Sequence, residues 1–148
     1  MQRWKRRVPL GDLVTDRAAN ATEYGFGEGT TMYDSVLVFG DVMVGRNCWI
    51  GPNVILDGSG GLAVGDWVCI ASGSQIYSHD SSRRFVNMGR GEDGRAKTTI
   101  GSAVFIGPNS VILMGVSIGD GVTIGAMSFV NKSIPSGATA FGIPARVR

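Results

Sequence analysis

The sequence predicts an all-β fold in which short parallel strands wind into a solenoid, and three observations support this prediction. First, an aliphatic residue occupies every sixth position of one long stretch, at 100, 106, 112, 118, 124 and 130. Second, Gly follows that residue in four of the six repeats. Third, a period of six fits neither an α-helix nor an amphipathic strand, whose periods are about 3.6 and 2. Stacked coils of short strands joined by tight corners explain the period.

The same register extends back to Phe26. Apolar residues hold positions 26, 32, 38, 44, 50 and 56, and after two inserted residues the register resumes at 64, 70 and 76. Between Ile76 and Ile100 there are 18 residues more than one repeat requires, so we expect a protruding loop at 80–99. Fifteen repeats predict about five coils of three strands within a domain at 26–148, with a C-terminal tail at 135–148.

Each repeat has two further regular positions. The residue two before the aliphatic one is often small enough to point into the prism, as at Cys48, Ser74 and Val122. The fourth position is often Gly, Asn or Asp, which tolerate the left-handed backbone of a tight corner. These corner candidates are Gly29, Asp41, Asn47, Asn53, Gly73, Asn109, Gly115 and Gly121.

Residues 1–25 precede the repeats and form a predicted N-terminal arm and cap. Four of the first seven residues are basic. This run is either a solvated arm or a contact for an anionic partner, such as membrane lipid head groups or a lipid-linked sugar pyrophosphate. Residues 10–20 are a candidate for a short helix that covers the open first coil.

Composition excludes several classes of protein. A net charge of +2 over 148 residues argues against a dedicated nucleic-acid binder. The two cysteines lie 21 residues apart in different phases of the repeat, so we expect free thiols and a reducing cytoplasm. The chain has no apolar run of the roughly 20 residues that a membrane span needs, and no stretch resembling a signal peptide.

Side chains alternate along a strand, so the residue before each inward aliphatic residue should point outward. On the face we call the third, four of these five outward residues are apolar, which predicts a subunit interface. The five are Leu37, Ile55, Gln75, Val111 and Phe129. On the second face Trp49 and Phe105 point outward, and they either wall a groove for a sugar or adenine or pack peripherally.

Several motifs resemble those of the hexapeptide-repeat acyltransferases. They are Ile-Gly-Pro-Asn at 50 and 106, Ile-Gly-Asp-Gly at 118, Ile-Gly-Ala at 124 and the ending Gly-Ile-Pro-Ala-Arg at 142–146. Within that superfamily the chain is most similar to small sugar O-acetyltransferases of bacterial surface-polysaccharide synthesis. The resemblance implies a left-handed parallel β-helix, a homotrimer, and acetyl-CoA bound as acyl donor between subunits.

His79 is the only histidine and lies where a strand leads into the long loop. A lone His is more often structural, but long loops in compact repeats are usually functional. It also matches the position of the catalytic histidine of the family. The resemblance therefore implies that His79 is the general base of a direct transfer from acetyl-CoA to a sugar hydroxyl.

Two carboxylates are candidates to orient the imidazole of His79. Asp80 is adjacent to it in sequence, and Asp57 lies one coil earlier. Asp57 either orients His79, binds the acceptor, or is a solvated corner carboxylate. With Asn53 and Trp49, these two residues make up the predicted acceptor-binding set.

The resemblance places CoA along the last coils and the tail. Small residues at Gly107, Pro108, Gly125 and Ala126 would let pantetheine approach the backbone. The remaining predicted donor contacts are Asn131, Lys132 and Arg146, of which Lys132 and Arg146 are cations that would suit phosphates.

Residues 81–99 of the long loop carry five cations against two carboxylates, which would suit phosphates of CoA or of a nucleotide sugar. A mobile loop without a partner is the alternative. Two other functions stay open: an amino-sugar N-acetyltransferase, and a non-catalytic scaffold that binds CoA or sugar. A catalytic zinc needs three protein ligands, and with one histidine we predict no metal site.

Overall fold

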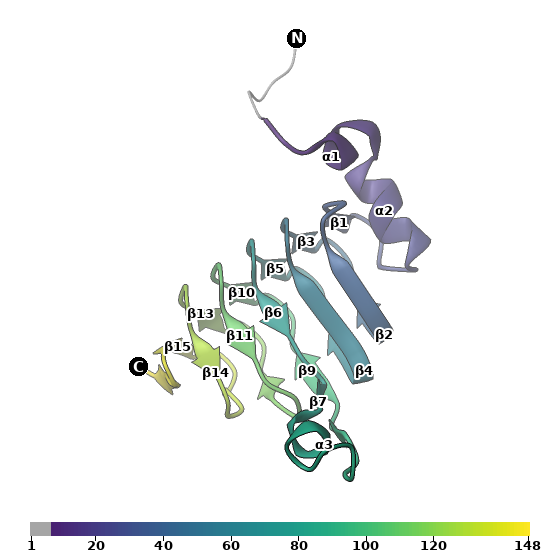
Figure 1. The fold of residues 1–148 in the computed structure, drawn as a ribbon. Coiled ribbons are helices and arrows are strands. Elements are labelled where there is room, and N and C mark those ends of the chain that lie inside the picture. Colours follow the sequence, from purple (N-terminus) through teal and green to yellow (C-terminus); the bar gives the residue numbers. More distant parts are fainter. Residues whose placement is uncertain (1–6) are drawn as a thin grey trace.

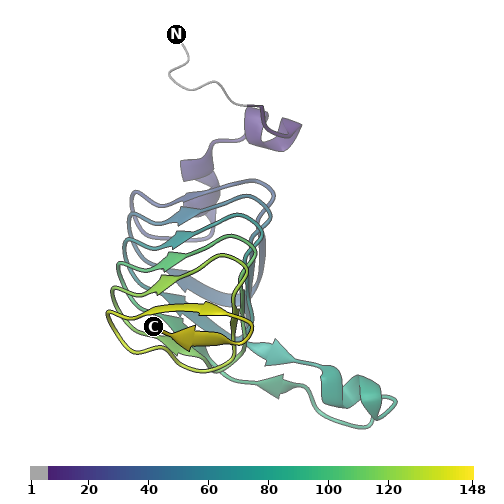
Figure 2. The same cartoon turned by 90° about the vertical axis from the view of Figure 1, so that its left-hand side faces the viewer.

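The computed structural model describes residues 7–148 and shows a parallel β-helix of about six turns. The coils stack into a triangular prism, with the N-terminal helices at one end and a loop projecting from one edge (Figures 1 and 2). In residues 7–148 no helix is long and apolar enough to cross a membrane. The proposed lipid contact of the basic N-terminus falls on residues that lie outside this description, apart from Arg7.

The second face of the prism is one sheet of short strands in register. Its parallel order pairs equivalent residues of successive coils, for example Ile50 with Ile70 and Ile106 with Ile124. The strands are β1 (Thr31–Met32), β3 (Trp49–Ile50), β5 (Cys69–Ile70), β10 (Phe105–Ile106), β13 (Thr123–Ile124), β15 (Thr139–Gly142) and the antiparallel β16 (Ala145–Val147).

The third and first faces merge into a second sheet, because two long strands turn from one face to the other without a break. These are β2 (Leu37–Val44) and β4 (Ile55–Val64), and β4 absorbs the two inserted residues through a register shift opposite Gly40 to Val42. The third face continues with β6 (Gln75–Ile76), β11 (Val111–Ile112) and β14 (Phe129–Val130), and the first with β9 (Thr98–Ile100) and β12 (Ser117–Ile118).

The core confirms the six-residue register. Of the fifteen predicted inward residues only Val38 is partly exposed, and the others are buried. The small residues two positions earlier are buried as well, including Cys48, Ser74 and Val122. Stacking identical aliphatic positions coil on coil removes a continuous apolar column from water, which is the main favourable contribution to this fold.

The predicted count of five coils is one too few. After Val130 the register takes one step of four residues, so Ile134 and then Ala140 become inward positions and are buried. Ile134 bridges to Ile118 on the first face, and Ala140 pairs with Ile124 on the second. The predicted tail therefore contributes to a sixth coil, and the hairpin of β15 and β16 closes this end of the prism (Figure 1).

The three edges of the prism are named here by one residue each. The Asp120 corner joins the first face to the second, the Gly107 corner joins the second to the third, and the His79 corner joins the third to the first. Seven of the eight predicted corner residues adopt a positive φ; at the eighth, Asp41, the neighbouring Gly40 does so instead. Trp67, Ala103 and Met127 also take this conformation, so the coil imposes it on side chains that do not favour it.

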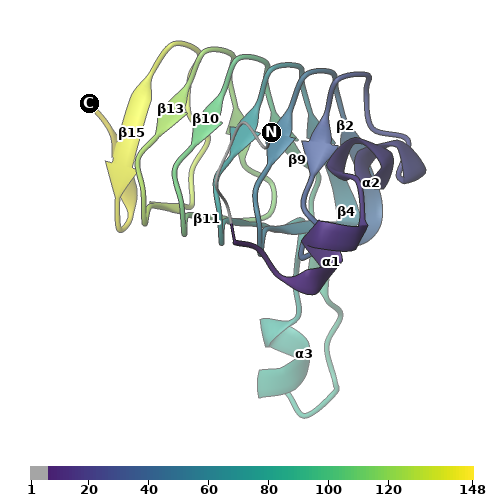
Figure 3. The same ribbon diagram turned by 90° about the horizontal axis from the view of Figure 1, so that it is seen from above.

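Two short helices cover the first coil, α1 (Leu10–Val14) and α2 (Arg17–Glu23). Asp16 caps α2 by accepting hydrogen bonds from the backbone of Ala18 and Ala19, and Ala21 packs into the core. The long insertion leaves the prism at the His79 corner and projects away from it (Figure 3). It consists of β7 (His79–Asp80), α3 (Ser82–Val86) and β8 (Gly94–Arg95).

Candidate active site

His79 stands at the base of the projecting loop. Its strand β7 pairs antiparallel with β8, and the backbone of Ala96 donates to the carbonyl of Ser78 where the loop returns. Thr98 closes the base by donating to the carbonyl of Tyr77 and accepting from the backbone of Gly115. The imidazole is therefore held on a braced edge of the prism, with its side chain 33% exposed.

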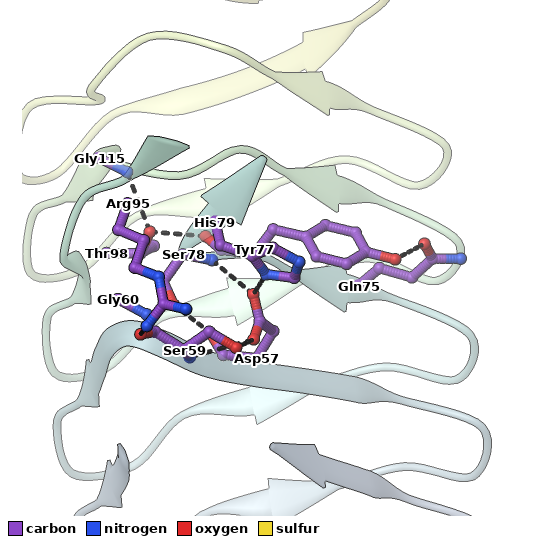
Figure 4. A network of polar contacts seen from close by, with 10 residues as sticks. All are labelled: Asp57, Ser59, Gly60, Gln75, Tyr77, Ser78, His79, Arg95, Thr98 and Gly115. Atoms are coloured by element: carbon purple, nitrogen blue, oxygen red, sulfur yellow. Dashed lines mark hydrogen bonds and ion pairs between the residues drawn. The ribbon is translucent and has the colours of Figure 1, made fainter. Parts of the chain in front are cut away.

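Asp57 meets His79 across one coil. It lies on β4, and its Oδ2 is 2.5 Å from Nδ1 of the imidazole (Figure 4). Asp57 is only 1% exposed, so it is not a solvated corner carboxylate. A buried carboxylate requires hydrogen-bond partners, and the ring supplies one of them.

Two serines supply the remaining partners of Asp57. Ser59 donates to Oδ1 from its hydroxyl at 2.6 Å and from its backbone at 3.0 Å, and the backbone of Ser78 donates to Oδ2 at 3.1 Å. Burial raises the pKa of Asp57, but the hydrogen bonds from Ser59, His79 and Ser78 together lower it to about 2. Asp57 is thus a carboxylate throughout the neutral range.

Gly60 allows β4 to approach the histidine strand this closely. A side chain there would come 2.2 Å from the carbonyl oxygen of Ser78, so only Gly fits. The backbone of Gly60 donates to the hydroxyl of Ser78 at 2.8 Å, and that hydroxyl donates to the carbonyl of Asp57 at 2.6 Å. The Gly-Ser-Gly-Gly run at 58–61 therefore brings the two halves of the pair together.

The pairing determines the tautomer of His79. A carboxylate only accepts hydrogen bonds, so Nδ1 must carry the proton. In the neutral ring Nε2 then carries a lone pair that can accept a proton. An imidazole oriented in this way is competent to accept a proton from a bound hydroxyl.

The ring of His79 borders two pockets, which share Tyr77 as their common wall. The C-terminal pocket, of about 480 Å³, is also lined by Asp80, Ser81, Leu113, Met114 and Asn131. The N-terminal pocket, of about 330 Å³, is also lined by Leu37, Phe39, Ile55, Asp57 and Ser59. The hydroxyl of Tyr77 is 2.8 Å from Oε1 of Gln75, which holds the shared wall in place.

The structure brings Asp57 to His79 but separates the other predicted acceptor residues from it. Asp80 lines the C-terminal pocket, yet its carboxylate accepts from the backbone of Ser82 and not from the imidazole. That hydrogen bond lowers the pKa of Asp80. Trp49 packs edge-on against Tyr33 on the second face, and Asn53 is an exposed residue of the Gly107 corner.

The predicted donor residues lie in three places. Asn131 lines the C-terminal pocket, and Lys132 is exposed next to it. Arg146 is exposed on β16, at the closed end of the prism. Gly107, Pro108, Gly125 and Ala126 lie at the Gly107 corner, the opposite edge of the third face.

The glycines of the Gly107 corner have a structural reason of their own. A side chain at Gly107 would come 2.5 Å from the backbone nitrogen of Ala126, and one at Gly125 would come 2.7 Å from Cβ of Phe141. These positions must be Gly for successive coils to stack. Their small size therefore does not by itself indicate a ligand.

Neither cysteine belongs to the site. Cys48 is buried and Cys69 half-buried, both as free thiols, and burial raises the pKa of each. A thiolate nucleophile requires the opposite shift.

Ser59, Ser78 and the wall formed by Tyr77 were not among the residues predicted from the sequence. All three lie within the two segments that flank the pair, 56–61 and 75–80. The sequence feature that could have pointed to these residues is the Gly-rich insertion at 58–61, followed one coil later by the loop insertion. It did not reveal which polar atoms would meet.

A parallel β-helix built on six-residue repeats, with a histidine–carboxylate pair at one edge, defines the class to which this chain belongs. Family profiles match two separate stretches: "Bacterial transferase hexapeptide (six repeats)" at 97–132 and "Hexapeptide repeat of succinyl-transferase" at 41–78. The chain belongs to the hexapeptide-repeat transferase family.

Curated relatives are larger enzymes. The galactoside O-acetyltransferase of Escherichia coli is 35% identical over 72% of this chain and 53% of its own length. The bifunctional protein GlmU of Acinetobacter baylyi is 34% identical over 89% of this chain and 34% of its own length. The chain thus spans about a third to a half of these relatives.

Solved structures share the fold. A galactoside acetyltransferase in complex with coenzyme A has a TM-score of 0.73 and 30% identity, covering 83% of this chain and 62% of its own. AntD, an N-acyltransferase from Bacillus cereus in complex with dTDP and 3-hydroxybutyryl-CoA, has a TM-score of 0.75 and 26% identity, covering 83% and 70%.

Proposed function

We propose that this protein is an acetyl-CoA-dependent acetyltransferase that transfers an acetyl group to a sugar hydroxyl. The observation that carries the proposal is the imidazole of His79, oriented by buried Asp57 and bordered by a pocket on each side. Two pockets that meet at one base provide for two substrates. Relatives that are acetyltransferases, and a similar structure that holds coenzyme A, support the choice of donor.

In the proposed reaction the acceptor hydroxyl gives its proton to Nε2 of His79 while its oxygen attacks the thioester carbonyl carbon. The carbon–oxygen bond forms, and the carbonyl π electrons move onto oxygen to give a tetrahedral oxyanion. When this collapses, the carbon–sulfur bond breaks and the sulfur takes the proton from the imidazolium. The products are an acetyl ester and CoA thiol, with no acyl-enzyme. Asp57 stabilises the transient imidazolium.

We assign the donor to the C-terminal pocket and the acceptor to the N-terminal pocket. Asn131, one of the residues that the family resemblance assigns to CoA, lines the former. The Gly107 corner is too remote within one chain, because it lies across the third face. A neighbouring subunit that packs its third face against this one would bring its Gly107 corner to the groove, so the proposed assembly is a homotrimer with sites between subunits.

The apolar residues of the third face support this assembly. Val111 and Phe129 are half-buried on this face and line neither pocket, whereas Leu37, 50% exposed, and Ile55 lie on the same face where it borders the N-terminal pocket. Val111→Asp should convert the trimer to monomers in sedimentation velocity and abolish activity, because a carboxylate in an apolar interface is costly. Thr123→Asp, on the second face, is the matched control. A wild-type monomer at micromolar concentration would contradict the assembly.

The function is tested by thiol release from acetyl-CoA over a panel of free, glycosidic and phosphorylated sugars. The wild type should release thiol only with an acceptor, and NMR of the product should show an acetyl ester. His79→Asn, whose amide nitrogen takes the place of Nδ1 and can still donate to Asp57 but which has no base, should be inactive and remain folded in a thermal melt. Full turnover by this variant would eliminate the proposed base.

An amine acceptor is the second candidate, because a similar structure is that of an N-acyltransferase. Amino sugars in the same panel separate the two functions. An amide product in preference to an ester would replace the O-acetyl assignment and leave the role of His79 unchanged.

A further inference from the structure

Arg95 stands beside the candidate site from the opposite strand of the loop. In the antiparallel pair of β7 and β8 it lies directly across from His79, and opposed residues project from the same side of such a ribbon. Its Nη1 donates to the carbonyl of Ser59 at 3.2 Å, and Ser59 lines the N-terminal pocket. Figure 4 shows the guanidinium reaching back over Ser59 and Gly60. Arg95 is therefore at the rim of the proposed acceptor pocket.

In the described part of the chain the charge of Arg95 has no counterion. Within residues 7–148 the ion pairs involve Arg46, Arg84 and His79, and none involves Arg95. A guanidinium has five N–H donors, and one of these is occupied by Ser59. Of the two carboxylates at the site, Asp57 is bonded to His79, Ser59 and Ser78, and Asp80 accepts from the backbone of Ser82.

A second cation follows the same edge of β4. A side chain at Gly61 would meet the methylene groups of Lys97 at 3.5 Å, so the stem of Lys97 runs over this Gly. Lys97 is also absent from the ion pairs of the described chain. Within residues 7–148 Arg95 and Lys97 thus have no ion-pair partner and follow β4 at Ser59 and Gly61, next to the pocket; we call this edge the cationic rim.

The interior of the N-terminal pocket offers little else for recognising a polar substrate. Its walls are Leu37, Phe39, Ile55 and the ring of Tyr77. The hydroxyl of Ser59 already donates to Asp57. A saccharide lying on these apolar walls would be positioned mainly by whatever binds at the cationic rim.

We propose that the natural acceptor is a phosphorylated saccharide, a glycosyl phosphate or diphosphate, whose phosphate is bound by Arg95 with Lys97 beside it. This inference rests on the proposed function. Arginine binds phosphate oxygens through two parallel N–H groups, and an ionised partner roughly doubles the strength of each hydrogen bond. The phosphate of the acceptor lies at the rim, and the hydroxyl to be acetylated lies at Nε2 of His79.

The test compares matched acceptors of one sugar, its methyl glycoside and its 1-phosphate, by the KM for thiol release. The 1-phosphate should have the lower KM, and Arg95→Gln should raise that KM at least about tenfold more than it raises the KM of the methyl glycoside. Arg95→Lys should recover part of the difference. Arg46→Gln, at the remote Asp120 corner, makes the same change in net charge and should leave the ratio unaltered. The diphosphate of the acceptor could belong to a nucleotide sugar or to a lipid-linked sugar. The nucleotide-diphosphate and short-chain polyprenyl-diphosphate forms of the same sugar distinguish these two sources.

Three outcomes would overturn the inference while the proposed function stands: no preference for the phosphorylated acceptor, an equal rise of KM for both acceptors in Arg95→Gln, or a rise of the KM for acetyl-CoA in its place. The last would assign Arg95 to the donor. If the wild type releases no thiol with any sugar, the proposed function fails and this inference fails with it.

Discussion

The Asp120 corner and the His79 corner use the same residue types for different purposes. At the Asp120 corner, Asp and Ser side chains form a ladder in which each accepts from the backbone N–H one coil earlier. Asp66 accepts from Arg46 at 2.7 Å, Ser102 from Asp66 at 3.0 Å, Asp120 from Ser102 at 2.7 Å and Ser136 from Asp120 at 3.0 Å. The ladder runs along the solvent-facing edge and satisfies the backbone.

At the His79 corner the regular ladder is absent because two insertions interrupt the coils. Two extra residues lengthen β4, and one coil later the loop leaves the prism. The carboxylate of Asp57 then turns inward, where it is 1% exposed and faces an imidazole. Burial and local register, not residue type, therefore distinguish a structural carboxylate from one that orients a base.

The largest expected effect is on turnover. Asp57→Asn should lower kcat by roughly 10²–10⁴-fold, because an amide can donate to Nδ1 and move the ring proton to Nε2, which removes the base. Asp120→Asn makes the same substitution at the other corner and should leave kcat unchanged. Equal activity of the two variants would remove the distinction between the corners.

The next largest effect is expected on the stability of the fold at low pH, through the carboxylate of Asp57. The pKa of Asp57 is lowered from 3.8 to about 2, so its carboxylate stabilises the folded state fully above pH 4, and this contribution is lost as pH falls through 2. It amounts to about 2 kcal/mol of the free energy of unfolding. Denaturant titrations at pH 6 and pH 2 should show the wild type losing about that much more stability than Asp57→Asn. Parallel losses in the two proteins would show that Asp57 is not strongly hydrogen-bonded.

Removing a hydroxyl should cost more at the His79 corner than at the Asp120 corner. Ser78→Ala leaves the N–H of Gly60 and the carbonyl of Asp57 without this partner in a buried site, which should lower the free energy of unfolding by about 1–3 kcal/mol. Ser102→Ala exposes one N–H to water and should cost less than about 1 kcal/mol. Thermal melts of both variants measure the difference.

The smallest change in the free energy of unfolding is expected when one side chain of the Asp120 ladder is truncated to Ala. Asp120→Ala removes one exposed hydrogen bond to Ser102 and should change the free energy of unfolding by no more than about 1 kcal/mol. A larger loss would mean that the ladder acts cooperatively along the edge. A melt of Asp120→Ala together with Ser102→Ala would then show non-additive losses.

The periodic part of the molecule was predictable because each coil repeats the burial pattern of the one before. Fourteen of fifteen inward residues are buried as expected, and the loop leaves where the register breaks. The sixth coil was missed because the step from Val130 to Ile134 is four residues, which a strict period of six does not detect. His79 was identifiable as the one imidazole at a break in the register. Trp49 and Asn53 were predicted to bind the acceptor because they lie only one coil before His79, but Trp49 is on the second face and Asn53 is at the Gly107 corner.

The six-residue spacing of apolar residues is enough to predict which side chains face the interior of the coil, because the inward position of a strand residue depends on local spacing and hydrophobicity alone. Which carboxylate meets the imidazole depends instead on how the coils stack. Asp57 and His79 are 22 residues apart, and their contact depends on the close approach that Gly60 permits and on the serines that saturate the carboxylate. Such contacts depend on how irregular segments stack across coils, and no periodic signal records that.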